Sequence, residues 1–543
     1  MIRINQLKLM PEHTDQDMLK AIRHSLKVND EIELEYKVVK RSIDARHKPE
    51  ILYVYAVNVK IKNQTLEKNI IKKVNNNNIM LTTENKYDFP YTINSFTEAK
   101  NSRPIIIGFG PAGMFCALFL ARCGLKPIVI ERGQCVEERM KTVNEFWTKN
   151  LLDINSNVQF GEGGAGTFSD GKLNTMIKDP TGRIAKVLET FVEAGADASI
   201  LYNNKPHIGT DVLCNIVRNI RKEIIRLGGE VRFNTCLEGI DAPNNKVKSI
   251  KIRDIRDCNS KTSQIDCNTV VMAIGHSARD TFSMIHEIGI QMTSKSFAVG
   301  LRIEHPQEFI NYNTYGDTSY KNLPVADYKV TYQASTGRGV YSFCMCPGGY
   351  VVNASSENEM LAINGMSYSK RGSKNANSAL IVTVTPQDFD GDGPLAGIEF
   401  QRNLERAAYK EGKGSIPVQL ASDFINNKVS TGFGKVVPCI KGSYQFSNII
   451  NILPEYFSQT IIEGLENFNC LIKGYSMDDA VFSGIESRTS SPVRIIRDDI
   501  GESNVKGVFP CGEGAGYAGG ITSAAIDGIK TAERIAQIIA QNI

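Results

Sequence analysis

Alternating and helix-spaced apolar positions divide the chain into short strands, amphipathic helices and glycine-rich turns. In the first hundred residues their order is strand, helix, strand, strand, helix, which favours a small α+β domain with a ferredoxin-like arrangement. A linker is expected to follow it at 95–102. The predicted strands lie at 2–9, near 32–43 and near 50–62, and the predicted helices lie at 14–27 and 66–74.

The next apolar strand runs directly into a glycine turn. Gly108 permits a tight turn, and Gly110 lets a pyrophosphate approach bare backbone. Gly113 lets the helix at 112–123 pack close to the sheet, and the unpaired amides at the start of this helix favour negative charge. Glu131 closes the following strand and is placed to bind a ribose hydroxyl. The segment therefore predicts a dinucleotide site.

A second glycine-rich stretch, at 160–174, also satisfies the G-x-G-x-x-G spacing. The residues before it, 155–159, are not an apolar strand, and 167–174 does not begin an amphipathic helix. A second dinucleotide fold is therefore not expected here. We predict instead a loop that lies over a cofactor.

The nucleotide domain is predicted to be split along the chain. A strand at 270–274 arrives at Gly275, and residues 507–528 give a strand, a glycine loop and the start of a helix at 521–538. The β-rich runs between them predict an inserted domain. The fold class is therefore α/β, with a split Rossmann-type domain, an inserted β-rich α+β domain and the N-terminal ferredoxin-like α+β domain. The predicted boundaries are 1–100, 101–280, 281–475 and 476–543.

Composition and charge narrow the class of protein. The 543 residues are 42% hydrophobic and carry a net charge of only +4, which suits several folded domains. Twelve scattered cysteines without metal-type spacing predict reduced thiols. The apolar stretch at 105–125 contains Pro111 and Arg122, and the first residues lack the apolar core of a signal peptide. We expect a cytoplasmic protein with no metal and no membrane partner, and its oligomeric state stays open.

The nucleotide turn, the strand ending at Gly275 and the closing residues Cys511, Gly512 and Glu513 together resemble the FAD-binding members of the glutathione reductase superfamily. The chain is more closely similar to a bacterial family of uncharacterised FAD-dependent dehydrogenases, often described as NAD(FAD)-utilizing dehydrogenases. This resemblance spans nearly the whole chain, including the N-terminal unit. The segments that carry it are 164–175, 275–280, 344–352, 488–494 and 512–528.

The resemblance implies FAD as the cofactor of the split domain. Because no second nucleotide fold is expected, NAD(P)H stays open as an electron donor that binds transiently in the insert, and the organic substrate itself is the alternative source of electrons. It also implies that Glu513 bonds the ribityl chain, a role usually given to Asp, and that the helix at 521–538 points its positive end at the flavin pyrimidine. The residues expected to bind the cofactor are Gly108, Gly110, Pro111, Ala112, Gly113, Glu131, Arg132, Gly164, Gly166, Lys172, Gly275, Gly512, Glu513, Gly520 and Ile521.

His276 and Arg488 are the candidate catalytic residues. His276 follows a strand that should end beside the flavin, where an imidazole suits the removal of a proton while a hydride leaves for flavin N5. The alternative is that it caps a helix or contacts the cofactor. Arg488 is the arginine best placed to grip a substrate carboxylate bidentately, ahead of Arg302, Arg338 and Arg371. Ordinary surface placement is the alternative for each arginine.

Two further motifs have structural alternatives. Cys344 and Cys346 would face the same side of a strand, but a disulfide between residues two apart is strained, so buried structural thiols are favoured over a redox pair. The segment 388–399 has the spacing of a calcium loop, but a strand precedes it and Pro394 stiffens it. A turn that caps the helix at 397–410 is therefore favoured.

These features predict an enzyme, an FAD-dependent oxidoreductase that transfers a hydride between flavin N5 and an organic small-molecule substrate under the inserted domain. Two alternatives stay open. The basic stripe at 37–48 allows an RNA-binding or RNA-modifying flavoprotein, although a solvated strand edge is favoured and a nucleic-acid partner is not expected. The second alternative is a flavin-binding protein without turnover.

Overall fold

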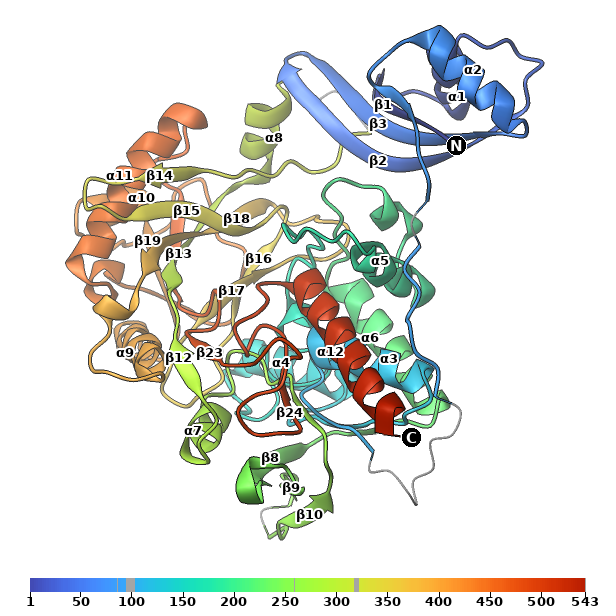
Figure 1. Ribbon diagram of the computed structural model, residues 1–543. Helices are drawn as coiled ribbons and strands as arrows, with labels where there is room; N and C mark the ends of the chain where they lie inside the picture. The colour runs from blue at the N-terminus through green and yellow to red at the C-terminus, as the bar shows by residue number, and fades with distance from the viewer. Residues whose placement is uncertain (85, 94–102, 258, 317–321, 543) are drawn as a thin grey trace.

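The computed structural model describes residues 1–84, 86–93, 103–257, 259–316 and 322–542, and shows an N-terminal domain beside a larger body (Figure 1). The predicted linker at 95–102 lies outside the described residues. Within the described part of the chain, no helix is long and apolar enough to cross a membrane. The strands of this part form six sheets.

The N-terminal domain is an antiparallel sheet with two helices packed against it. The strand order β2-β3-β1-β4, with β1 antiparallel to both β3 and β4, confirms the predicted ferredoxin-like unit. Helix α1 begins after Thr14, which forms a capping box with Asp17, and it buries Met18 and Ile22 against the sheet. The elements are β1 (Ile2–Leu9), α1 (Asp15–Leu26), β2 (Leu34–His47), β3 (Glu50–Ile61), α2 (Gln64–Val74) and β4 (Ile79–Leu81).

A five-stranded parallel sheet, in the order β24-β11-β5-β6-β7, is the Rossmann-type part of the body. The first of these strands in sequence, β5, lies at the centre, so the chain order reverses between β5 and β11, and ligands bind outside the carboxyl ends of strands at such a switch point. All residues of β5, β6, β11 and β24 are buried, because helices and loops cover both faces. The strands are β5 (Ile105–Ile107), β6 (Ile128–Ile130), β7 (Glu230–Arg232), β11 (Val270–Met272) and β24 (Val508–Pro510).

Helices α3 (Pro111–Arg122) and α12 (Ile521–Asn542) pack side by side in this part, as Figure 1 shows. They approach closely because Gly528 has no side chain: a Cβ there would lie 2.2 Å from the carbonyl oxygen of Ala112. The predicted helices at 112–123 and 521–538 are therefore present. The neighbouring elements are α4 (Val136–Lys149), α5 (Arg183–Glu193), α6 (Thr210–Arg226), and the antiparallel strands β8 (Thr235–Asp241), β9 (Ser249–Asp254) and β10 (Ser263–Asp266).

The rest of the body is built on a seven-stranded sheet in the order β14-β15-β18-β13-β22-β19-β21. Neighbouring strands are antiparallel except β19 and β21. Strand β22 follows residue 475, where the sequence predicts that the insert ends; all six of its residues are buried, so no alternation of polar residues marks it. The strands are β13 (Phe297–Pro306), β14 (Thr331–Gln333), β15 (Gly339–Cys346), β18 (Asn375–Val384), β19 (Ile416–Leu420), β21 (Tyr444–Phe446) and β22 (Val481–Glu486).

Helices and two small sheets surround the seven-stranded sheet. One small sheet pairs β12 (Met292–Ser294) with β23 (Val493–Ile495), and the other has the order β17-β16-β20. The remaining elements are α7 (Arg279–Glu287), α8 (Gln307–Tyr315), β16 (Tyr350–Asn353), β17 (Ile363–Met366), α9 (Ala396–Glu411), α10 (Ala421–Ile425), β20 (Ile440–Lys441) and α11 (Glu455–Leu471).

The long β2–β3 hairpin joins the N-terminal domain to the body (Figure 1). Strand β2 carries the basic stripe at 37–48 and is an edge strand, as favoured from the sequence. Its middle is nevertheless docked: the Arg41 N–H donates to the Tyr202 carbonyl at 2.7 Å, and the Arg41 carbonyl accepts from the Asn204 N–H at 2.9 Å. Ile51 of β3 belongs to an apolar cluster with Tyr315 of α8 and other residues of the body. The hairpin is thus part of one packed structure with the insert.

Candidate functional site

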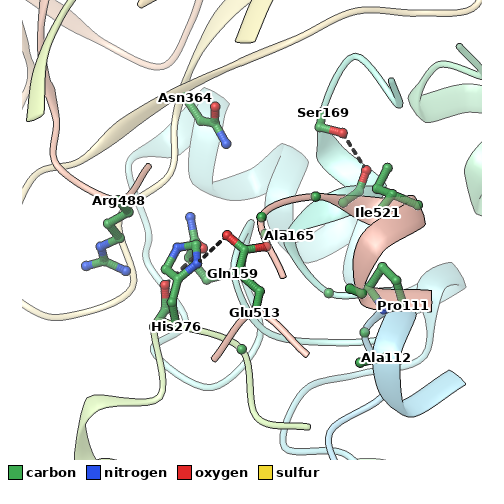
Figure 2. A pocket seen from close by; sticks show the side chains of 18 of the residues that line it. Pro111, Ala112, Gln159, Ala165, Ser169, His276, Asn364, Arg488, Glu513 and Ile521 are labelled. Atoms are coloured by element: carbon green, nitrogen blue, oxygen red, sulfur yellow. Dashed lines mark hydrogen bonds and ion pairs between the residues drawn. The ribbon is translucent and has the colours of Figure 1, made fainter. Parts of the chain in front are cut away.

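A cavity of about 670 Å³ lies between the loops at the carboxyl ends of the parallel strands and the inserted sheet (Figure 2). One of its walls is formed by the glycine turn after β5, the second glycine loop and the start of α12. The opposite wall is formed by residues of the insert, among them Ser342–Cys346, Asn364 and Glu486. The volume is within the range of natural cofactor and ligand sites.

The first glycine turn has the backbone that the sequence predicts. Gly108 has φ +94°, and a Cβ there would lie 2.3 Å from the carbonyl oxygen of Ala273. A Cβ at Gly110 would instead meet only the Cα of Gly164, at 3.8 Å, so its open side faces the cavity. Gly110 is the N-cap of α3, and it has no side chain to occupy the first amides of that helix. These amides are available to an anion.

Glu131 lies at the end of β6, is 6% exposed and lines the cavity. Its carboxylate accepts hydrogen bonds from the backbone N–H groups of Phe109 at 2.7 Å, and of Gly133 and Gly161 at 2.9 Å. A carboxylate has about four acceptor positions, so one is left for a hydroxyl in the cavity. Glu131 therefore fits the predicted ribose contact and also holds both glycine loops together.

Arg132 lines the cavity beside Glu131, but its guanidinium is engaged. Its Nη2 donates to the two Asp280 carboxylate oxygens, each at 2.7 Å, and its carbon lies 4.8 Å from the centre of the Phe160 ring. Arg132 thus forms the wall of the cavity at this end.

The second glycine loop is irregular, as predicted, and contains only a short 3₁₀ turn at Ala165–Phe168. A buried arginine, Arg139 of α4, fixes its shape. Its guanidinium donates at 2.7–3.0 Å to four backbone carbonyls, those of Asn157 and Val158 just before the loop and of Glu162 and Gly164 within it. Sequence reasoning misses Arg139 because nothing local distinguishes it from the surface arginines of an amphipathic helix.

The start of α12 faces the same cavity. A Cβ at Gly519 or Gly520 would meet nothing within 4 Å, and the same is true of Gly275 at the end of the β11 segment. All three glycines line the cavity, so the space that their missing side chains leave opens into it. Gly166 lies between the two helix starts: a Cβ there would be 3.2 Å from Ile521 Cγ1 and 3.7 Å from Pro111 Cγ. Two helix N-termini thus converge on one loop.

Most of the predicted cofactor-binding residues line this cavity, and two do not. Gly113 and Gly512 lie behind its wall, where a Cβ would be 2.0 Å from the Gly108 carbonyl oxygen and 2.5 Å from Ala112 Cβ, respectively. They act by permitting close packing. The predicted residues that line the cavity are Gly108, Gly110, Pro111, Ala112, Glu131, Arg132, Gly164, Gly166, Lys172, Gly275, Glu513, Gly520 and Ile521. With two helix N-termini and an open glycine cradle, the residues present fit a dinucleotide cofactor.

His276 and Glu513 meet inside the cavity, where His276 Nδ1 lies 3.1 Å from Glu513 Oε1 (Figure 2). Among the described residues, His276 Nε2 is buried and has no hydrogen-bond partner. If Nδ1 carries the proton that Glu513 accepts, Nε2 presents a lone pair. The two residues come from opposite ends of the split domain, and their pairing supports the idea that His276 handles a proton.

Arg488 is placed differently from the sequence expectation. It lines the cavity, but its Nε and Nη2 donate to Glu405 of α9 at 2.9 and 2.8 Å, and its Nη1 donates to Ser356 at 2.5 Å. Arg279 of α7 binds the same Glu405 carboxylate at 2.9 and 2.7 Å. Three of its five N–H donors thus join segments of the protein, and the Nε and Nη2 pair that would grip a substrate carboxylate bidentately is already bound to Glu405.

A second buried arginine supports the insert's wall. Arg302 donates to Asn377 at 2.7 Å, to Asn364 at 3.3 Å and to Glu486 at 3.1 Å. Burial raises the pKa of Glu486, and the adjacent Arg302 charge opposes that rise. Asn364 Oδ1 also accepts from the Gly365 N–H at 2.8 Å, so the amide of Asn364 is held at the cavity, as Figure 2 shows. No sequence signal singles out Asn364.

Cys344 and Cys346 both line the cavity, next to a bulge in β15. Cys346 is buried, and its Sγ lies 3.2 Å from the Cys344 carbonyl oxygen. Cys344 is open to the cavity but enclosed by protein, and this desolvation raises its thiol pKa to about 12; the pKa of Cys346 is raised to about 11. Both thiols are thus held protonated at neutral pH. The burial of Cys346 agrees with the predicted buried thiol, whereas Cys344 is exposed to the cavity and not buried as predicted.

The predicted calcium-like segment is used for internal contacts. Asp388 caps a 3₁₀ turn with Thr385 and pairs with Arg338, and Glu399 pairs with Arg402 one turn further along α9. Over the described residues, no group of three His, Cys, Asp or Glu side chains is arranged to hold a metal ion.

Comparison with known families identifies the central part of the chain. Residues 296–489 match the family described as FAD-dependent protein, C-terminal domain-like, and residues 1–60 match a domain of unknown function. The first match contains the wall that faces the two helix N-termini. It confirms FAD as the cofactor. An uncharacterized protein of Clostridium beijerinckii is 49% identical over 539 residues, which are 98% of each chain.

Solved structures resemble the chain more distantly. A glycerol-3-phosphate dehydrogenase from Bacillus halodurans, complexed with FAD, is 12% identical with a TM-score of 0.36; the match covers 82% of this chain and 65% of that one, less than two thirds of its length. An E. coli quinol fumarate reductase is 12% identical with a TM-score of 0.37, and 82% and 71% of the two chains are covered. Similarity at this level carries no information on activity.

Proposed function

We propose that this chain, which belongs to the same family as the Clostridium beijerinckii protein, is an FAD-dependent oxidoreductase. It transfers a hydride between its flavin and a small organic substrate. The substrate is held against the inserted sheet. The observation that carries the proposal is the single cavity that runs from the glycine turn of α3 to the wall made by Cys344, Asn364 and Glu486.

The contacts proposed for FAD follow the lining of this cavity. The N-terminal amides of α3 are available to the pyrophosphate, and Glu131 has one acceptor position left for a ribose hydroxyl. The second glycine loop, fixed by Arg139, and the open backbone at Gly519 and Gly520 leave room for the flavin end. This distribution supports the resemblance to the glutathione reductase superfamily, with Glu513 in the place where Asp is usual.

The chemistry proposed for the chain's own residues is proton transfer and control of charge. When bound, FAD supplies the hydride acceptor or donor. The positive end of α12 favours negative charge in the adjacent part of the cavity. His276 takes a proton from the substrate at Nε2, while Glu513 holds Nδ1 and fixes the direction of the ring. The buried walls around Arg302 keep water away from this region.

A nicotinamide nucleotide as electron donor stays part of this proposal. The chain folds one parallel sheet with one glycine turn of the dinucleotide type among its described residues, so NAD(P)H would bind transiently in the substrate part of the cavity. The comparisons give no support to the RNA-binding alternative. Arg41, in the middle of the basic stripe, binds the backbone of the body and stacks on Tyr53 and Tyr202 at 5.2 and 5.3 Å.

The proposal is tested on purified full-length protein. We expect a yellow protein that releases FAD on denaturation and whose visible absorbance bleaches in the absence of oxygen when NADH, NADPH or a pool of small metabolites is added. A protein that binds no FAD even after incubation with it would overturn the proposal, and stable FAD that no donor bleaches would point to binding without turnover.

A matched pair of glycine variants ties the FAD to this cavity. Gly520→Val fills open cavity space without a backbone clash, so the protein should fold but retain at least tenfold less FAD. Gly432→Val is the control. A Cβ at Gly432 would also meet no atom within 4 Å, but Gly432 lies exposed on the surface, away from the cavity. Equal FAD content in the two variants would contradict the assignment of the cofactor to the cavity.

A further inference from the structure

Cationic side chains gather where the second glycine loop meets the insert. Lys172 lies near the end of the second glycine loop, and Arg371 follows β17 on the insert. Carboxylates of the chain accompany them, so the balance of charge at this part of the cavity depends on which of the groups are paired. The lining cations here are Lys172, Lys205, Lys329 and Arg371, and the neighbouring carboxylates are Asp170 and Asp327.

Two of the four cations are neutralised inside the chain. Arg371 donates to both oxygens of Asp170, from Nε at 3.1 Å and from Nη2 at 2.5 Å. Lys205 pairs with Asp327 at 2.6 Å. Both carboxylates are thereby used, and neither has charge left for another lysine.

The other two cations keep their charge. Lys172 lies 4.0 Å from Asp170, which Arg371 already holds, and its Nζ donates to the uncharged carbonyl of Met345. Lys329 is exposed at the cavity, and within the described part of the chain it forms no ion pair. Two uncompensated positive charges therefore face this space.

No other carboxylate that lines the cavity pairs with them among the described residues. Glu486 is bound by Arg302. Glu513 contacts the imidazole of His276, Glu131 accepts from backbone N–H groups, and neither forms an ion pair with Lys172 or Lys329. The lining of the cavity also contains Phe343 and Met345, and Met345 is the residue whose carbonyl Lys172 binds. The site thus combines positive charge with an apolar wall.

We propose that Lys172 and Lys329 bind the carboxylate of a small organic acid, and that this acid is the substrate of the oxidoreductase. Lys172, which the sequence predicts as a cofactor contact, is thereby assigned to the substrate instead. The inference rests on the proposed function, because it places the acid in the part of the cavity left to the substrate. A phosphate ester is the less favoured anion, since the fork of an arginine is its best partner and the fork of Arg371 is already closed on Asp170. Lys329, exposed at the cavity, also attracts an anion from solution.

The test measures binding, separately from turnover. The FAD-loaded protein is titrated with acetate, butyrate, benzoate and succinate, with butyramide and benzamide as neutral partners of matched shape, and with inorganic phosphate. Perturbation of the visible flavin spectrum and the shift of the melting temperature give the Kd. We expect at least one acid to bind at least tenfold more tightly than its amide, and to bind more weakly as salt rises from 0.05 to 0.5 M.

Lysine variants locate the site. Lys329→Gln and Lys172→Gln should each weaken the acid about tenfold, the cost of one charge-assisted hydrogen bond, with the amide unaffected. Lys473→Gln is the matched control, because Lys473 is exposed outside the cavity. Lys329 is exposed, so its variant tests the proposal even if Lys172→Gln folds poorly.

Four results would overturn the inference. The acids could bind no more tightly than the amides, or equally well to the wild type and both lysine variants. Phosphate could bind in place of the acids with the same dependence on the lysines, or none of the acids could bind at 100 mM. Each leaves the proposed function standing if FAD is bound and a neutral donor or a nicotinamide bleaches it. Absence of bound FAD would instead mark the failure of the proposed function itself.

Discussion

Replacement of Glu405 by Gln should loosen the contact between the two halves of the body. Glu405 of α9 is completely buried, and its carboxylate accepts four hydrogen bonds at 2.7–2.9 Å from Arg279 and Arg488, and a fifth at 2.6 Å from Ser487. The two guanidinium groups hold the pKa of Glu405 well below its usual range, against the effect of burial. An amide in this position leaves two buried cations facing a neutral group. Their other carboxylate is Glu357, which contacts Arg279 directly but lies 4.0 Å from Arg488.

Removing one partner from a buried ion pair lowers the free energy of unfolding by about 3–5 kcal/mol. We expect the loss for Glu405→Gln to fall in this range, because Gln keeps the shape of the Glu side chain and removes only its charge. For 543 residues the unfolding entropy is about 1.1 kcal/mol/K, so the melting temperature falls by about 3–4 °C if the whole chain unfolds as one unit, and by more if the insert unfolds alone. Scanning calorimetry of the FAD-loaded protein measures the shift. Glu399→Gln on the same helix is the control, because its pairs with Arg402 and Arg406 are exposed. A shift within 1 °C for Glu405→Gln, or an equal shift for both variants, would refute the reasoning.

Three further outcomes are expected. Gly110→Ala should fold with wild-type circular dichroism but bind FAD at least tenfold more weakly. Gly108→Ala should lower the melting temperature, because Gly108 has a φ of +94° and a Cβ there would clash with a carbonyl oxygen. Equal behaviour of the two variants in FAD titration and thermal melts would contradict the geometry. His276→Gln should keep its FAD but lower the stopped-flow rate of flavin reduction about 10²–10⁴-fold, with the exposed His286→Gln as control, and an unchanged rate would remove His276 from the chemistry. Burial lowers the pKa of His305 from 6.5 to about 4, so the unfolded chain binds a proton at this residue at a higher pH than the folded chain does. The free energy of unfolding is therefore complete above pH 6.5 and falls by about 3 kcal/mol as the pH falls towards 4. The melting temperature of His305→Gln should decline less steeply over this pH window than that of the wild type.

The parts of the site that could be predicted from the sequence are those that depend on local backbone. Gly108 must adopt a positive φ and Gly113 must tolerate a carbonyl oxygen at 2.0 Å from a Cβ position, and only glycine meets these demands. Their spacing after an apolar strand therefore identifies the nucleotide turn without any knowledge of distant residues. The irregular second loop could be predicted for the same reason, because neither a strand nor a helix surrounds its glycines.

The arginines could not be assigned in this way, because their roles depend on partners far along the chain. Arg488 binds Glu405, 83 residues away, and Arg139 binds backbone carbonyls that lie 18 to 25 residues later in the chain. A guanidinium has five donors and binds any acceptor that the fold presents, so its residue type and spacing do not reveal its target. Asp170 shows the same limit: it lies inside the predicted loop, yet its pairing with Arg371 appears only once the insert is folded.

The N-terminal domain has a structural relation to the site that the sequence leaves hidden. Ile51 of the β2–β3 hairpin packs in one apolar cluster with Met345 and Ala376 of the insert. Met345 lines the cavity, and its carbonyl accepts the hydrogen bond from Lys172. Displacement of the hairpin would expose this cluster and free the wall that positions the lysine. A truncation that removes the N-terminal domain therefore changes the part of the cavity that we propose for the substrate, so this packing alone accounts for a loss of activity on truncation and no landing surface for RNA is needed.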